Sequence, residues 1–376
     1  MRLIRRRLGQ TDYALLGAVL ALLVLGLEMV YSASFVIAHN NPALGSDTYF
    51  FTRQLLWALL GGSALVLCAR LDYHWWQRAA LPLSAIVGLM LLAVAATHLG
   101  HSAYGAQRWL RLGPLPPIQP SELAKLALVL GAATWLSRHR DRLASLRSGL
   151  LPFSLALAGV ATLIMLQPDL GSTIVLVLTA WTLLFLAGAP VWHILLVGGA
   201  GLAAILALSL SAPYRLQRVM AFLDPSQDPL GIGWHIIQAT IALGSGGLLG
   251  RGLGASRQKF YYLPSAHTDA IFAVIGEELG FLGTTAVLGL LAVLAYRGLQ
   301  IALQAPDTYG GLLAAGITTW LVCQALINIG VVTAVLPFTG IPLPFVSFGG
   351  SSLVVSLAAI GIVLNIARQS VHEESS

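Results

Sequence analysis

Charged side chains are scarce in this sequence. They make up 10% of its 376 residues, whereas hydrophobic residues make up 57%, and the mean hydropathy is +0.81. Soluble globular proteins carry about 25% charged and about 45–50% apolar residues. So little charge cannot keep the surface of a folded chain in water. The composition therefore excludes a soluble globular protein and predicts an integral membrane protein.

Cysteine is almost absent as well. The two cysteines, Cys68 and Cys323, both lie inside apolar runs. They offer no disulfide framework, and neither has the spacing of a zinc ligand. We interpret both as small buried hydrophobic residues.

Long apolar runs, by contrast, recur along the whole chain. A helix needs about 20 mostly apolar residues to cross the hydrocarbon core of a bilayer. The first run is longer than the apolar core of a secretory signal, which has about 7–15 residues, so we interpret it as a membrane helix. The predicted spans are residues 13–38, 50–69, 79–99, 120–136, 150–166, 170–186, 191–210, 269–296, 309–336 and 350–368. The predicted fold is an all-α integral membrane protein with about ten transmembrane helices in one polytopic domain, residues 1–376.

Basic residues in the short connections predict the orientation of these helices, because cytoplasmic loops collect lysine and arginine. With the first helix starting inside, the inner side holds the N-terminal arginines, Arg70, Arg78 and the four arginines of residues 138–147. Both termini are therefore predicted to be cytoplasmic. The long segment 211–267, between the seventh and eighth helices, is predicted to be a large extracytoplasmic loop.

This long loop is rich in cations. It contains five basic residues against Asp224 and Asp228, a balance of +3. Two more arginines, Arg108 and Arg111, lie in the connection between the third and fourth helices, on the same predicted side. The surplus is either an incidental solvated charge or a site for an anion, for which the planar guanidinium fork suits phosphate. The five basic residues of the loop are Arg215, Arg218, Arg251, Arg257 and Lys259.

Within the loop, residues 233–243 are apolar but too short to span a bilayer, which predicts a short interfacial or re-entrant helix. The glycine-rich run 244–254 follows. It is not a phosphate-binding P-loop, because no Gly-Lys-Ser/Thr follows it and no strand precedes it. Its glycines either let the backbone approach a ligand or form a flexible turn.

Ionisable residues within a membrane span are costly and are functional candidates by default. Glu122 and Lys125 stand three residues apart and share a helical face, so they form either a structural ion pair or part of a reactive centre. Asp169 follows Gln167 and Pro168 and is either a helix cap or a site residue.

Asp269 is the most suggestive of these residues. It opens the eighth helix directly after the basic loop, next to His267. It is either a helix N-cap or a carboxylate at the mouth of an outward cavity. Residues 337–352 support a cavity, because their prolines prevent a regular helix, and such backbone is tolerated at membrane depth only where it is buried or lines a wet space.

At the motifs that contain Glu122, Lys125, Asp169 and Asp269, the sequence resembles the SEDS family (shape, elongation, division and sporulation), the FtsW/RodA group. The sequences of residues 256–264 and 365–369 are closer to the FtsW branch, whereas the sequence of residues 105–108 is more similar to RodA. Ser265 stands where FtsW-like proteins usually have glutamate. The motifs that carry the resemblance are 105–110 (GAQRWL), 119–125 (QPSELAK), 167–172 (QPDLGS), 252–254 (GLG), 256–259 (SRQK), 266–269 (AHTD), 276–280 (GEELG) and 342–352 (PLPFVSFGGSS).

The resemblance implies a peptidoglycan glycosyltransferase of the bacterial cytoplasmic (inner) membrane that polymerises lipid II into glycan strands during cell division or elongation. Lipid II is a disaccharide-peptide on undecaprenyl diphosphate. The implied partners are a class B penicillin-binding transpeptidase and other membrane proteins of the division or elongation machinery, with no nucleic acid. Two alternatives are a lipid II flippase and a non-catalytic division scaffold. The concentration of chargeable groups on the outer side, with no matching inner site, favours the enzyme over the flippase.

The resemblance also assigns roles. Asp269 matches the family's essential aspartate and is expected to act as a general base or to hold a divalent cation, Mg²⁺ or Mn²⁺; no organic cofactor is expected. The departing diphosphate is expected to meet Arg251, Arg257 and Lys259, with Arg108 and Arg215 as further candidates. Glu122 and Lys125 are expected to shape the cavity, and His267 to stand beside Asp269.

Overall fold

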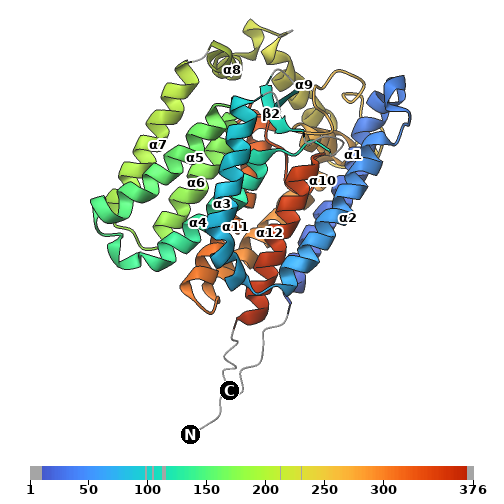
Figure 1. Cartoon of the computed structure of the whole chain (residues 1–376). Helices are drawn as coiled ribbons and strands as arrows, with labels where there is room; N and C mark the ends of the chain where they lie inside the picture. Colours follow the sequence, from blue (N-terminus) through green and yellow to red (C-terminus); the bar gives the residue numbers. More distant parts are fainter. Residues whose placement is uncertain are drawn as a thin grey trace.

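The protein is a bundle of long helices (Figure 1), seen in a computed structural model that describes residues 11–97, 100–103, 106–111, 116–211, 213–229 and 231–370. Each of the ten predicted apolar runs forms a helix. The ten are α1 (Tyr13–His39), α2 (Tyr49–Arg70), α3 (Tyr73–Ala96), α4 (Pro120–Arg138), α5 (Leu151–Met165), α6 (Leu170–Leu186), α7 (Val191–Ser211), α10 (Ile271–Leu303), α11 (Thr308–Val332) and α12 (Gly350–Gln369).

Among the described residues, eight helices are long and apolar enough to cross a membrane. Of the other two long helices, α6 is apolar but has 17 residues, and α4 contains the buried ion pair of Glu122 and Lys125. The prediction of an all-α membrane protein is confirmed, apart from one short β-hairpin. The number of ten spans stays a prediction.

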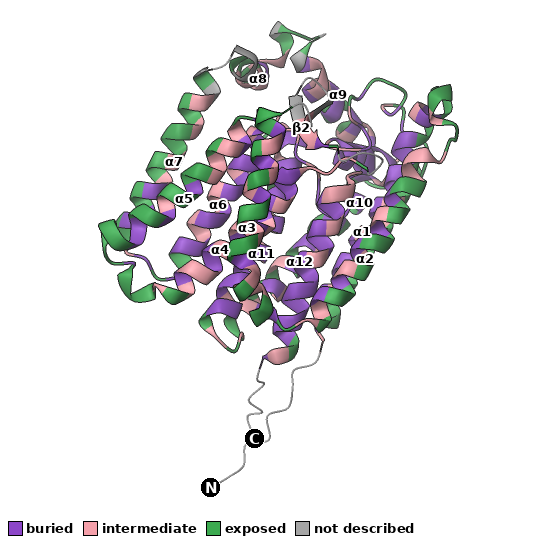
Figure 2. Cartoon of the chain, viewed as in Figure 1, coloured by how far each residue is buried: buried purple, intermediate pink, exposed green. Residues whose placement is uncertain are grey.

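The helices differ in how far they are buried (Figure 2). α11 and α12 are mostly buried, whereas α2, α3 and α7 present large exposed faces. Those faces carry leucines such as Leu56, Leu81 and Leu195, as expected of helices that lie against lipid. α12 packs closely along α2, where a Cβ added to Gly361 would come within 2.3 Å of the carbonyl oxygen of Leu65. Glycine is therefore required there by the distance between the two helices.

Both ends of the described chain lie at one end of the bundle (Figure 1). Asp12, at the start of α1, forms an ion pair with Arg297 of α10 at 2.7 Å. Near the end of α12, Asn365 accepts a hydrogen bond from the backbone N–H of Tyr73, at the start of α3. This arrangement agrees with termini on the same side of the membrane. That this side is the cytoplasmic one stays a prediction.

The opposite end of the bundle carries the connections with structure of their own. A hairpin of β1 (Gly100–Ala103) and β2 (Ala106–Leu110) lies between α3 and α4. The all-α prediction missed it, because its short strands lack a run of alternating apolar residues. Short turns complete the chain: η1 (Pro42–Leu44), η2 (Arg140–Arg142), η3 (Leu146–Leu150) and η4 (Pro225–Gln227).

The long loop contains two helices, where one was predicted. α9 (Ile232–Ser245) includes the predicted helix at residues 233–243. α8 (Pro213–Leu223) was not predicted. Its signal was the spacing of Arg215 and Arg218, three residues apart between apolar residues, which places both on one face of a helix.

After α9 the chain runs beside a break in α10. Gly280 has φ 68° and ψ −161°, which is not helical. The N–H groups of Phe281 and Leu282 bond to the carbonyls of Gly247 and Leu248 at 2.9 and 3.2 Å. Because backbone groups of the loop replace the interrupted hydrogen bonds of the helix, the break is fixed in place.

Candidate functional site

A polar cavity of about 340 Å³ lies at the end of the bundle that carries the hairpin and the long loop. Seven parts of the chain line it: β2, the starts of α4 and α6, the two loop helices α8 and α9, the segment before α10, and the chain from Phe338 to the start of α12. Its charged and titratable side chains are Arg108, Glu122, Asp169, Arg218, His235 and Asp269. We call it the Asp269 cavity.

Backbone contacts hold Asp269 in the cavity wall. Its carbonyl accepts a hydrogen bond from the side chain of Asn328 at 2.7 Å, and the carbonyl of Thr268 accepts one from Ser347 at 2.7 Å. α10 begins only at Ile271, after Ala270, and no side chain caps it. Helix capping is therefore not the role of Asp269, and its carboxyl group remains for the cavity.

The proline-containing segment before α12 forms the facing wall, as expected of irregular backbone beside a wet space. Gly340 has φ +72°, and a Cβ there would lie 3.4 Å from a carboxyl oxygen of Asp269. The side chain of Asn328 also bonds to the carbonyl of Ile341 at 2.7 Å, so one amide fixes Asp269 and this segment together. The distance between the two walls is thus set by α11.

The surroundings of Asp269 change its affinity for protons in both directions. Burial raises its pKa above the ordinary value, and the hydrogen bond from Thr268 and the charges of Arg108 and Arg218 lower it, with a net rise. Burial disfavours the charged form, whereas nearby cations favour it. The carboxylate is therefore more basic than in water, and the two arginines limit the rise in its pKa.

Arg108 and Arg218 reach the cavity from different elements. Arg108, on β2, donates from Nε to the carbonyl of Gln167 at 3.2 Å and from an Nη atom to the carbonyl of Pro168. Arg218, on α8, lies over the ring of Phe338 with Cζ 5.1 Å from its centroid. A guanidinium has five N–H donors. Arg108 uses two of its donors in these bonds. Both arginines line the cavity and bring positive charge to the side chain of Asp269.

His235, on α9, also lines the Asp269 cavity. Neither His235 nor Arg218 was among the substrate-binding residues predicted from the sequence. The ring of His235 lies 4.3 Å from that of Phe338, and its Nε2 is buried without a hydrogen-bond partner. Burial and the charge of Arg218 lower its pKa to about 4. His235 is therefore an uncharged imidazole near neutral pH. The signal in the sequence was a histidine within the apolar run 233–243.

Glu122, Lys125 and Asp169 have mainly structural partners. Glu122 and Lys125 form a buried ion pair at 2.7 Å, and Lys125 also donates to Gln324 at 2.7 Å. Lys125 does not line the cavity, whereas the second carboxyl oxygen of Glu122 is buried without a partner. Asp169 caps α6 by accepting from the backbone N–H of Ser172 at 3.0 Å, although it too lines the cavity.

The loop cations Arg251, Arg257 and Lys259 are not among the residues that line the Asp269 cavity. They belong to residues 246–259, which are held by Glu277 and Glu278 of α10, and we call this segment the glutamate-held loop. Lys259 is buried and bonds to Glu278 at 3.0 Å. Arg251 and Arg257 are exposed.

The two glutamates bind this loop through several donors. Glu277 accepts from the hydroxyl of Ser256 at 2.6 Å and from the N–H of Arg257 at 2.9 Å. Glu278 accepts from Ser32 of α1 at 2.7 Å and from the N–H of Gly254 at 2.9 Å. Lys259 and Arg251 therefore pair with Glu278 and Glu277, at 3.0 and 3.9 Å, and do not line the Asp269 cavity. That Arg251, Arg257 and Lys259 meet the diphosphate stays a prediction.

Two further predicted residues lie elsewhere. His267 is buried outside the cavity lining, with its ring 4.7 Å from Phe50 and 5.7 Å from Phe348. Burial lowers its pKa to about 4, so it is an uncharged part of the wall behind Phe348. The side chain of Arg215 lies outside the described residues.

The carboxylates do not form a metal site by themselves. Within the described residues, no group of three His, Cys, Asp or Glu side chains is placed to hold an ion. Mg²⁺ is commonly held by one or two carboxylates together with substrate phosphates. Asp269 and the unpartnered oxygen of Glu122, both in the lining of one cavity, are carboxylates of the kind that such an ion uses.

Comparisons with known proteins show which family the chain is similar to. A family model described as Cell cycle protein, for FtsW, RodA and SpoVE, matches residues 13–372. The chain is 43% identical over 361 residues to a probable peptidoglycan glycosyltransferase FtsW of Trichlorobacter lovleyi, covering 96% of this chain and 94% of that one. It is 45% identical over 360 residues to stage V sporulation protein E of Bacillus subtilis, covering 96% and 97%.

Solved structures with the same fold include a chain of a peptidoglycan synthase complex that coordinates polymerization and crosslinking. It has a TM-score of 0.77 and 34% identity, and the match covers 96% of this chain and 98% of that one. The rod shape determining protein RodA of Thermus thermophilus has a TM-score of 0.70 and 30% identity, with 96% and 98% covered. Both matches span nearly the whole bundle.

Proposed function

The chain belongs to the FtsW/RodA/SpoVE family of the cytoplasmic membrane, and on that premise we propose that it polymerises lipid II with Asp269 as the catalytic carboxylate. Peptidoglycan glycosyltransferase activity follows from the family and from relatives that bear that name. The observation that supports the role of Asp269 is one cavity holding this carboxyl group, with a raised pKa, and two arginines.

In the proposed reaction, a sugar hydroxyl of one lipid-linked substrate attacks the anomeric carbon of another. A glycosidic C–O bond forms, and the bond from the anomeric carbon to the diphosphate oxygen breaks. Asp269 takes the hydroxyl proton, which is easier for a carboxylate with a raised pKa. Arg108 and Arg218 meet the negative charge that develops on the departing lipid diphosphate.

A divalent cation fits this scheme. Asp269, with Glu122 nearby in the same cavity, would hold it against the diphosphate, where it would supply further neutralising charge. A class B penicillin-binding transpeptidase is the proposed partner, and the similarity to a chain of a peptidoglycan synthase complex supports this assignment.

The test is Asp269→Asn in a lipid II polymerisation assay with the purified protein and its transpeptidase. General base catalysis contributes about 10²–10⁴-fold, so we expect a loss of that size. Because burial raises the pKa of Asp269 in the folded state, the fold loses stability as the pH rises from the ordinary pKa of an aspartate through the raised one. The variant should therefore melt at the same or a higher temperature near neutral pH.

Asp141→Asn, in a turn at the other end of α4, is the matched control and should keep full activity. Full activity of Asp269→Asn would remove this residue from the mechanism. A wild-type protein that moves lipid II across vesicles but forms no polymer with any transpeptidase would favour the flippase instead.

A further inference from the structure

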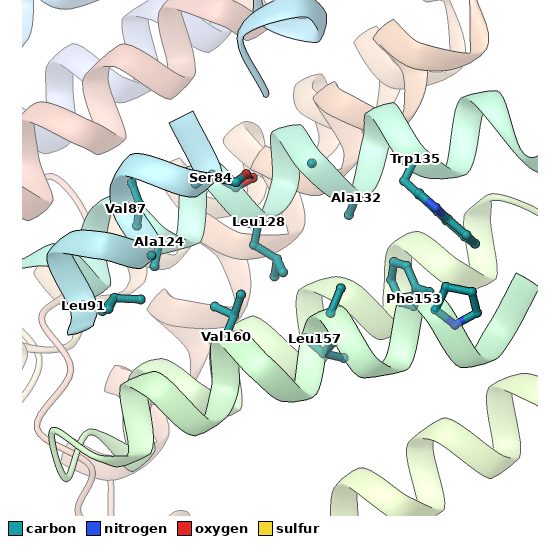
Figure 3. Close-up of a pocket in the computed structure, with 15 residues that line it drawn as sticks. Ser84, Val87, Leu91, Ala124, Leu128, Ala132, Trp135, Phe153, Leu157 and Val160 are labelled. Carbon is teal, nitrogen blue, oxygen red and sulfur yellow. Dashed lines mark hydrogen bonds between the residues drawn. The ribbon is translucent and has the colours of Figure 1, made fainter. Parts of the chain in front are cut away.

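A second cavity, of about 260 Å³, lies between α3, α4 and α5 (Figure 3). Leu91 of α3, Leu128 of α4 and Val160 of α5 point into it from the three helices. Apart from the hydroxyl of Ser84 and the indole N–H of Trp135, the side chains around it are apolar. We call it the α3–α5 cavity.

Small residues keep this space open. A Cβ added to Gly88 would meet no atom within 4 Å, and one added to Gly131 would meet only the hydroxyl oxygen of Ser84 at 3.5 Å. Protein interiors are otherwise packed as densely as organic crystals. An apolar cavity between membrane helices is therefore suited to bind the hydrocarbon part of a lipid.

Hydrogen bonds through Gln167 link one end of the α3–α5 cavity to the Asp269 cavity. Leu91 lines the apolar space, and its carbonyl accepts a hydrogen bond from the Gln167 side chain at 3.0 Å. The carbonyl of Gln167 in turn accepts from Nε of Arg108, which lines the polar space, at 3.2 Å. On α4, Glu122 faces the polar cavity and Ala124 the apolar one.

We propose that the α3–α5 cavity binds the isoprenoid tail of the lipid-linked substrate while the diphosphate lies at Arg108. This inference rests on the proposed function, because it takes its ligand from it. A charged group joined directly to a long hydrocarbon chain matches a cationic site that is linked through Gln167 to the lining of an apolar space. The arrangement also explains how one of two substrates is kept in register with Asp269 while its sugar reacts.

Photo-crosslinking tests the proposal independently of polymerisation. A diazirine amino acid replaces Val160, which points into the cavity, or its neighbour Gly159, which is exposed on the same helix and does not line it. The full chain is placed in phosphatidylglycerol–phosphatidylethanolamine vesicles with lipid II labelled in its sugar. We expect position 160 to capture several-fold more label than position 159, and excess undecaprenyl diphosphate to suppress that capture.

Equal capture at the two positions, or suppression by added phosphatidylglycerol as well as by undecaprenyl diphosphate, would mean that ordinary lipid fills the space, and the proposal would fall. A second variant, Gly88→Leu, places side-chain atoms in the hollow, where its Cβ has room. It should lower capture at position 160 and raise KM for lipid II several-fold, and Gly159→Leu should do neither.

The same experiment in the Asp269→Asn variant separates this inference from the proposed function. Capture at position 160 should be unchanged there, because tail binding needs no proton transfer. Absence of specific capture together with a polymerisation defect in Asp269→Asn would overturn the tail site alone. Specific capture by a protein that never polymerises would overturn the proposed function alone.

Discussion

The Asp269 cavity and the glutamate-held loop both bring cations and carboxylates together at one end of the bundle, but with different pairing. In the loop, Lys259 is buried against Glu278, and backbone donors satisfy the remaining carboxylate oxygens. In the cavity, Asp269 stands with Arg108 and Arg218 around an open space. Charges that are buried against one another mainly stabilise a fold, whereas charges that line a cavity can also contact a ligand.

The comparison also separates two kinds of acidic residue on neighbouring parts of the chain. Glu277 and Glu278 accept bonds from several donors and fix a segment of irregular backbone. Asp269 is held through its backbone carbonyl, which leaves its carboxyl group with few protein contacts. Substitutions in the two regions should therefore have different consequences, one for folding and the other for catalysis.

The largest effect should come from Glu278→Ala, which leaves Lys259 buried without its partner. Removing one member of a buried ion pair costs about 3–5 kcal/mol. We expect a much lower melting temperature in detergent and little folded protein. Lys259→Met in the same variant should restore part of the stability, because it removes the unpaired charge. Wild-type melting of the single variant would show that this pair does not hold the loop.

Next in size is Arg218→Ala in the cavity, compared with Arg257→Ala in the loop. Loss of one group that stabilises developing charge costs about 10²–10³-fold in kcat. We expect that loss for Arg218→Ala, measured as lipid II polymerisation under saturating substrate, with a small decrease in melting temperature because the contact with the Phe338 ring is lost. The side chain of Arg257 is exposed, and an alanine variant keeps the backbone bond to Glu277, so it should stay near wild type. Equal losses in both variants would contradict the division between the two regions.

A smaller and more specific effect concerns pH. As general base, Asp269 must be ionised, so activity should fall as the pH drops through its raised pKa. Arg218 lowers that pKa by its charge, and Arg218→Gln should therefore move the acid limb of the rate profile to higher pH. His235→Gln should leave the position of the limb unchanged, because His235 is neutral above its pKa of about 4.

If the acid limb follows His235 instead of Arg218, the base is the histidine and the assignment to Asp269 is wrong. Polymerisation rates between pH 4.5 and 8 for the three proteins, normalised to each maximum, are the measurement needed. The order of the limbs, rather than absolute activity, decides the outcome.

Sequence patterns predicted the structure correctly where it depends on residues of a single segment. The apolar runs predicted each long helix, and the prolines near Pro342 predicted irregular backbone. The pairing of Glu122 with Lys125 and the capping by Asp169 also follow from spacing along one helix, and the structure shows both, although Glu122 and Asp169 line the Asp269 cavity as well. The hairpin and α8 were missed because their signals are short and weakly apolar.

The sequence by itself determined that this chain is a helical membrane protein with a surplus of cations in its connections, because hydrophobicity and helix period are properties of neighbouring residues. Only the tertiary structure decided which cations face Asp269. Glu277 and Glu278 reach back about 20 residues along the chain to bind the glutamate-held loop, while β2 and α8 bring Arg108 and Arg218 into the cavity. Which cations lie near Asp269 depends on how segments far apart in the sequence pack together, and the pattern of residues within one segment does not determine this.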